Sequence, residues 1–272
     1  GLVDAYYSKN LNNPASRQTQ GRAFDLDAQE FKLNMAKLEI QAAPEPVGFR
    51  IDLGFGRGFE IFNGLEPGGD SLQFIPQAYV SIAPEGWGGV QLDFGKFYTS
   101  AGAEPTETHL NWNYSRSRIY TYGPYFHAGA RASVPLHEKF SIGGQLLNGW
   151  DSVRDRNSGK TVGLTSAYTD EKFSWFQTYL AGPENDETNT GTRQFYDTVV
   201  TFGTEKAQAY VNFDYGRFKP ILDTGAVGRG EIVALAVAAR FQITDTFAIS
   251  PRYGVYDDKD GAATGQTQVL QD

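Results

Sequence analysis

The chain carries a two-residue alternation of apolar and polar positions that is clearest in residues 231–256. One face of residues 231–242 holds large apolar side chains: Val233, Leu235, Val237, Ala239 and Phe241. The other face holds small or polar side chains, which are Ala234, Ala236, Ala238, Arg240 and Gln242. The pattern repeats in residues 247–256 after a short polar turn, so two strands and a hairpin are predicted. A soluble sandwich would turn the apolar face inward, whereas a membrane barrel would turn it toward lipid.

The same alternation recurs along the chain and predicts thirteen strands. They are expected at residues 1–10, 25–41, 47–56, 72–83, 87–98, 119–134, 139–150, 160–168, 173–181, 193–202, 207–217, 231–242 and 247–256. In the second of these segments the apolar face shifts between Met35 and Leu38, which indicates a β-bulge.

The connections between these strands decide between the two architectures. They alternate strictly between short and long, as in outer-membrane barrels with short periplasmic turns and long extracellular loops. A soluble sandwich has no reason to keep this order. Aromatic residues gather beside the short turns: Trp87, Phe140, Phe173, Phe202, Phe241 and Phe247. A second group lies at the loop ends: Tyr98, Trp150, Tyr196, Tyr215 and Tyr256. Two such bands match the girdles at membrane interfaces.

The predicted fold class is therefore all-β, an antiparallel up-and-down transmembrane β-barrel that residues 1–272 form as a single domain. The longest apolar run, residues 232–239, is far shorter than the roughly 20 residues of a membrane-spanning helix. The chain has no Cys, in keeping with export through a thiol-oxidising periplasm. It begins at Gly1 without Met, which predicts a mature chain whose signal peptide has been removed. The net charge of -8 argues against a nucleic-acid partner.

Six segments carry a family resemblance through their order and spacing: residues 1–7, 47–56, 77–80, 93–97, 111–117 and 148–150. With these segments, nearly the whole chain resembles the putative β-barrel porin-2 (OmpL-like) family of bacterial outer-membrane proteins. The resemblance implies an outer-membrane location, contact with lipid and lipopolysaccharide, and passive diffusion of small hydrophilic solutes or ions.

The C-terminal segment departs from the family pattern. Members normally end on a strand with a terminal aromatic residue, and this chain ends with Gln271 and Asp272. A closed bacterial barrel needs an even number of strands, and 14–16 are expected here. Either a fourteenth strand begins near Gln266, or the closing strands are absent from this chain.

The inward faces of the predicted strands supply the candidate pore-lining residues. They are Arg50, Asp52, Gln91, Asp93, His127, Arg131, Gln145, Asn212, Asp214, Arg240 and Arg252. The longest connection, from Thr99 to about Arg118, is the candidate for a constriction folded into the pore. Its candidate residues are Asn111, Trp112, Asn113, Tyr114, Arg116 and Arg118. The alternative is a surface loop that packs its Trp and Tyr on the barrel rim.

No motif in the chain predicts catalysis, a metal site or a cofactor. The sequence has no G-x-S-x-G and no metal-spaced His pair. His127 is expected to line the lumen rather than to serve an esterase. A porin for small hydrophilic solutes or ions, alone or as a homo-oligomer, is the function predicted. The alternative is a barrel that acts as a sheath or scaffold for a periplasmic or surface partner, such as a multihaem cytochrome. A soluble secreted β protein is the third possibility considered.

Overall fold

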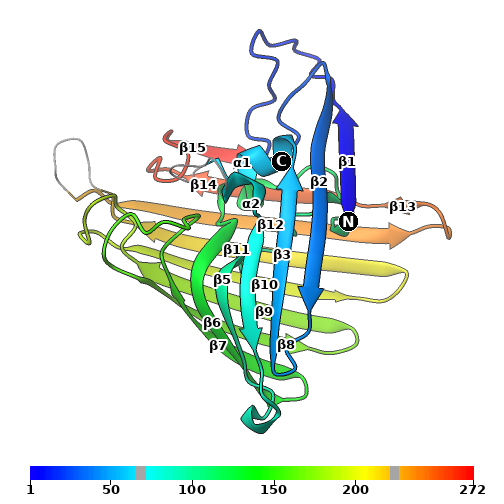
Figure 1. Cartoon of the computed structure of the whole chain (residues 1–272). Coiled ribbons are helices and arrows are strands. Elements are labelled where there is room, and N and C mark those ends of the chain that lie inside the picture. The colour runs from blue at the N-terminus through cyan, green and yellow to red at the C-terminus, as the bar shows by residue number, and fades with distance from the viewer. Residues whose placement is uncertain (65–71, 221–226) are drawn as a thin grey trace.

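A computed structural model describes residues 1–64, 72–220 and 227–272 and shows a single 15-stranded sheet (Figure 1). The strands are β1 (Leu2–Tyr7), β2 (Phe31–Ala42), β3 (Val47–Phe55), β4 (Gln77–Ile82), β5 (Gln91–Tyr98), β6 (Phe126–His137), β7 (Phe140–Leu147), β8 (Thr161–Thr169), β9 (Phe173–Gly182), β10 (Arg193–Gly203), β11 (Ala207–Phe218), β12 (Gly230–Gln242), β13 (Ala248–Ile249), β14 (Arg252–Asp258) and β15 (Gln268–Gln271). The helices are α1 (Arg57–Phe62) and α2 (Arg118–Tyr122), with 3-10 turns at Leu72–Phe74, Glu85–Trp87 and Thr108–Leu110. Within these described ranges no helix is long and apolar enough to cross a membrane.

The strand order follows the chain, so the predicted up-and-down topology is confirmed. Each strand pairs antiparallel with its chain neighbour from β1 to β12, and β14 and β15 continue the order while β13 pairs with β12. The sheet curls strongly: in Figure 1 the blue strands β2 and β3 stand upright, and the yellow and orange strands β10 to β12 run across the view. The strands β1 and β15 are the two ends of this hydrogen-bonded order in the part of the chain that the structure describes.

The large apolar residues lie on the outer face of the sheet. In β12, Leu235 and Val237 are each 40% exposed, while Ala236 between them is 1% exposed. All six aromatic residues predicted beside the short turns are also exposed to the outside. This arrangement is the reverse of a soluble sandwich and matches a barrel with a lipid-facing exterior.

The second aromatic band was predicted only in part correctly. Tyr256 is buried and its ring lies 5.1 Å from that of Tyr122 in α2. Trp150 packs edge-on against buried Phe195, and Tyr98 packs against Phe62 of α1. These rings therefore join aromatic clusters at the long-loop end. For Tyr98 and Tyr256 the partners come from α1 and α2, which the strand pattern does not reveal.

Several predicted strands begin later than the alternation indicates. The strand expected from residue 87 begins at Gln91, after the 3-10 turn at Glu85–Trp87. For two others, Pro explains the difference. Residues 72–74 form a 3-10 turn and β4 begins only after Pro76, which has no N–H to donate to a ladder. Residues 119–122 belong to α2, which begins after Ser117; the Ser117 side chain accepts from the Tyr120 N–H as an N-cap. Pro124 then separates this helix from β6.

The ends of the sheet also differ from the prediction. The strand predicted at residues 25–41 begins at Phe31, and its bulge lies at Asn34, where the register against Asp4 and Ala5 shifts. The bulge turns Met35 and Lys37 to the inner face. A further strand, β15, begins at Gln268, close to the position expected for a fourteenth strand.

Replacing Leu235 by Arg should destabilise the protein by about 2–4 kcal/mol, because a cation near the bilayer midplane faces hydrocarbon. The control is Ile243→Arg, in the turn that follows β12, where the cost should be roughly 0–1 kcal/mol. Urea unfolding from lipid vesicles measures both free energies. Equal costs at the two positions would contradict a lipid-facing outer surface.

Candidate functional site

The connection between β5 and α2, residues 99–117, runs along the inner face of the sheet; we call it the inner loop. Its N-terminal part is bonded to three wall strands. Gln145 of β7 donates to the Ser100 hydroxyl (2.9 Å), and Thr178 of β9 donates to the Ser100 carbonyl (3.0 Å). The Ala103 N–H donates to the Asn212 side chain of β11 (3.0 Å). These contacts hold the first residues of the inner loop against the middle of the sheet.

Two carboxylates attach the inner loop to strands near the two ends of the sheet. Lys37 Nζ of β2 lies 2.6 Å from Glu107 Oε1, and Arg252 Nη1 of β14 lies 2.8 Å from Glu104 Oε1. The Thr108 hydroxyl also donates to Asp4 of β1 (2.9 Å). All four charged groups of the two ion pairs are almost fully enclosed. The inner loop is therefore anchored to both ends of the sheet, at β1 and β2 and at β14.

The C-terminal part of the inner loop is braced by its own hydrogen bonds. Arg116 is buried and donates to the carbonyl oxygens of Pro105, Thr106 and Tyr114. The Ser117 N–H donates to Glu104 Oε2 (2.8 Å). A guanidinium with several fixed acceptors holds a turn rigidly. These internal hydrogen bonds give the C-terminal part of the inner loop a defined shape.

The other predicted constriction residues take different places. Asn111 donates to loop carbonyls, and Trp112 packs on Tyr210 of β11 with ring centroids 5.4 Å apart. Asn113 donates to the Ser250 carbonyl beside β14 (2.8 Å), and the Tyr114 hydroxyl donates to Asp4. Arg118 departs from the group, because it begins α2 and donates to the carbonyls of Gln20 and Gly21 in the β1–β2 connection.

The predicted pore-lining residues fall into two groups by exposure. One group is buried: Asp52, Asp93, His127, Gln145, Asn212 and Asp214. The other group is half-buried: Arg50, Gln91, Arg131 and Arg240. Arg252 differs from these four, because its side chain is only 8% exposed. The buried members bond to each other, to the inner loop or to neighbouring side chains of the wall.

A ladder of charges follows β2 and β3 on the inner face. Asp52 lies 3.0 Å from Arg50 Nε and 3.1 Å from Lys37 Nζ, and Glu39 lies 2.7 Å from Arg50 Nη2. Lys37 and Glu39 are not among the predicted pore-lining residues. The bulge in β2 was the available signal, because it moves the following odd-numbered residues to the inner face.

Arg131 forms a second ion pair on the inner wall. Its Nε lies 2.8 Å from Asp93 Oδ2, and its guanidinium lies 4.3 Å from the centre of the Phe97 ring. Asp93 also accepts from Ser81 and Gln91. The pair is therefore fixed on one side and half-exposed on the other.

His127 and Asn212 act in the wall through hydrogen bonds. His127 Nδ1 donates to the Gly149 carbonyl (3.0 Å), so in the neutral ring Nε2 accepts from the Thr99 hydroxyl (3.1 Å). His127 therefore links the start of the inner loop to the connection that follows β7. Asn212 Nδ2 donates to Asp197 (2.6 Å) and to Asp214 (3.1 Å). Among the residues that the structure describes, no three His, Cys, Asp or Glu side chains are grouped so that they could hold a metal ion.

The alanines on the inner face of β12 do not face open water. Ala234, Ala236 and Ala238 are buried in an apolar cluster, against which Ala101 and Ala103 of the inner loop pack. Small side chains at these positions leave room for the inner loop to approach the wall.

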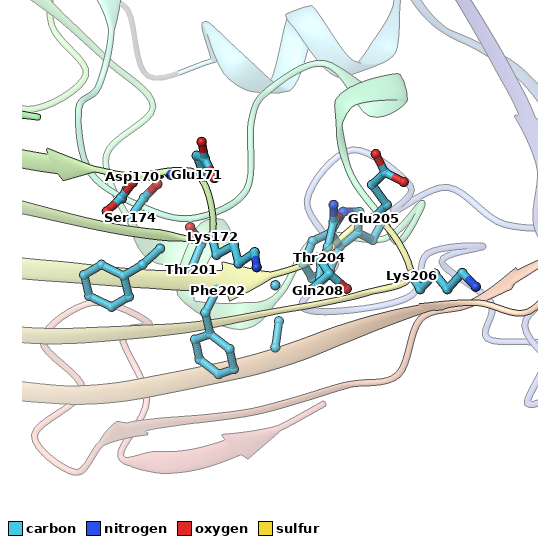
Figure 2. A pocket seen from close by; sticks show the side chains of 14 residues that line it. Asp170, Glu171, Lys172, Ser174, Thr201, Phe202, Thr204, Glu205, Lys206 and Gln208 are labelled. Carbon is cyan, nitrogen blue, oxygen red and sulfur yellow. Dashed lines mark hydrogen bonds between the residues drawn. The ribbon is translucent and has the colours of Figure 1, made fainter.

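Cavities lie at both the short-turn end and the long-loop end of the sheet. At the short-turn end, the turns after β8 and β10 and Trp112 of the inner loop line a cavity of about 860 Å³. Figure 2 shows Lys172 and Lys206 on these turns, with Gln208 of β11 beside the cavity. A smaller cavity of about 260 Å³ is lined by Trp112 and Arg240.

At the long-loop end, a cavity of about 400 Å³ lies between α2 and the loops that follow β7 and β9. Asp151 lines it and accepts from the N–H groups of Tyr125 and Phe126. Burial raises the pKa of the Asp151 carboxyl to about 7, against the lowering effect of these two donors. The Asp151 charge in this cavity therefore changes near neutral pH.

An up-and-down sheet with an apolar outside, a charged inside and a loop folded into the interior is the architecture of an outer-membrane porin. The model of the family described as Putative beta-barrel porin-2, OmpL-like, matches residues 1–272. The chain therefore belongs to this family, and the resemblance noted in the sequence is confirmed.

Two solved structures are similar in fold. The outer membrane channel DcaP of Acinetobacter baumannii has a TM-score of 0.62 and 13% sequence identity, over 97% of this chain and 78% of that chain. The anion-selective porin from Comamonas acidovorans has a TM-score of 0.54 and 13% identity, over 85% and 72% of the two chains. Among curated proteins, none matches this chain significantly. The protein is a porin of the bacterial outer membrane, a class through which small hydrophilic solutes or ions diffuse passively.

Proposed function

We propose that the diffusion route follows the inner loop, from the cavity of about 400 Å³ at the long-loop end to the cavity of about 860 Å³ at the short-turn end. The inner loop forms the constriction of this route. The observation that carries the proposal is the attachment of the loop to both ends of the sheet, through Lys37–Glu107 and Arg252–Glu104, and to the middle of the sheet, through Ala103–Asn212.

Two kinds of wall residue follow from this proposal. The half-buried Arg50, Gln91, Arg131 and Arg240 line the route and contact solutes. The enclosed Asp52, Asp93, Asn212 and Asp214, with Arg252, hold the wall and the loop in place. Trp112 and Arg240 stand together where the route opens toward the short turns.

The charge distribution supports a weak preference for cations. Lys37, Arg50, Arg131 and Arg252 each lie within an ion pair, so the wall itself should select weakly. The net charge of -8 must then be contributed largely by loops, such as residues 184–187. Acidic loops at the mouth concentrate cations, and salt screens this effect over about 8 Å at physiological ionic strength.

Single-channel recording in planar bilayers tests the function. We expect conductance in KCl with a mild cation preference that fades as the salt rises. Strong anion selectivity that persists at about 1 M salt, where the screening length is roughly 3 Å, would contradict the charge argument. Absence of conductance from the folded barrel would instead favour the sheath or scaffold function, and a copurifying periplasmic or surface protein would support that alternative.

A further inference from the structure

Arg193, the first residue of β10, is held by aromatic rings next to the cavity at the long-loop end. Its guanidinium carbon lies 4.7 Å from the ring centres of both Trp150 and Phe218. The two rings stand nearly perpendicular to one another. Aromatic faces hold a planar cation by cation–π attraction and shield it from water. The side chain is thus fixed, and it lies on the lining of the cavity of about 400 Å³.

Arg193 makes no ion pair or side-chain hydrogen bond within the described part of the chain, and the carboxylates of Glu184 and Asp151 act on its charge without direct contact. The nearby acids are engaged elsewhere. The Glu184 carboxylate accepts from the backbone N–H of Trp150 (2.9 Å) and from the Thr161 hydroxyl (2.6 Å). Asp151 accepts from two backbone N–H groups. A shielded guanidinium has five N–H donors that need acceptors, so this position favours an oxyanion.

The rest of the cavity suits an apolar body attached to that anion. Its lining includes Tyr122, Tyr125, Ala262 and Ala263 together with Trp150 and Phe218. A volume of about 400 Å³ lies within the range of pockets that hold one small molecule. A second cation, Arg156, also lines the cavity, but it lies 3.8 Å from Asp186.

We propose that Arg193 binds the carboxylate of a small aromatic or short apolar carboxylic acid that enters from the long-loop side. The planar guanidinium matches a carboxylate through two parallel N–H donors, and the rings around it contact the apolar body. The entry direction rests on the diffusion route proposed above; the binding itself does not. The site would place such acids at the mouth of the channel in preference to neutral solutes of the same size.

Benzoate is the probe, and isothermal titration calorimetry of the folded protein in detergent micelles is the measurement. We expect saturable benzoate binding to the unmodified protein and no measurable binding of benzyl alcohol or benzylamine. Arg193→Gln should weaken benzoate binding by about tenfold or more, because a charge-assisted hydrogen-bond pair is lost. The matched control is Arg156→Gln, which should stay within about twofold, since Arg156 lies on the same cavity but is paired with Asp186.

The results of these experiments distinguish failure of the Arg193 site from failure of the proposed diffusion route. Equal binding of benzoate and benzyl alcohol to the unmodified protein would overturn the proposal, even if Arg193→Gln does not fold. Unchanged benzoate affinity in a folded Arg193→Gln variant would overturn it as well. Conductance in KCl without benzoate tests the diffusion route alone. A barrel that conducts but does not bind benzoate would contradict only the Arg193 site. A barrel that binds benzoate but does not conduct would contradict only the diffusion route.

Discussion

Shortening the inner loop is expected to raise the single-channel conductance severalfold. The change replaces residues 103–114 by a short Gly-Ser linker, which removes Glu104, Glu107 and Trp112 together. These residues occupy the interior between β2, β11 and β14, so their removal should widen the route. Water should then hydrate Lys37 and Arg252, and the cation preference should decrease because two carboxylates have been removed and two cations uncovered.

Recording in planar bilayers checks both the conductance and the reversal potential of this variant. The control shortens residues 11–16, the largely exposed tip of the β1–β2 connection, and should leave both quantities unchanged. An unchanged conductance after removal of residues 103–114 would show that ions take a route that the inner loop does not limit.

The strands could be predicted from the sequence because the residue types in each strand show which of its faces points outward. Successive side chains point alternately to lipid and to the interior, which produces a period of two in the sequence, as Leu235 and Ala236 illustrate. In residues 117–124 the alternation led to a wrong prediction, because local signals for a helix outweigh it there. Ser117 and Pro124 are a helix start and a chain break, and they produce α2 where alternation alone indicated a strand.

The contacts of the inner loop could not be predicted in the same way. Glu107 is separated by 70 residues from Lys37, and Glu104 by 148 residues from Arg252. These separations follow no regular period in the sequence. The strands that the inner loop contacts depend on how the sheet curls in three dimensions. The inner-face alanines of β12 illustrate the same limit. Their small size fits an open lumen and a packed loop equally well, until the path of the loop is known.

Replacing Lys37 by Met should destabilise the protein by about 3–5 kcal/mol, because it leaves buried carboxylates without their cation. The Lys37 side chain is 5% exposed, and its Nζ lies 2.6 Å from Glu107 and 3.1 Å from Asp52. Arg50 still pairs with Asp52, so the loss should be concentrated on Glu107. We therefore expect the inner loop to detach from β2, with increased current noise in single-channel recordings as well as a lower free energy of unfolding.

The double variant Lys37→Met with Glu107→Met separates charge burial from loss of packing. Removing both partners avoids the unpaired charge, so most of the stability lost in Lys37→Met should return. Urea unfolding from lipid vesicles measures the single and double variants under the same conditions. A loss below about 1 kcal/mol in Lys37→Met is the value typical of a solvated surface pair. That result would mean that water reaches Lys37 and Glu107, and that the inner loop does not cover the wall at β2.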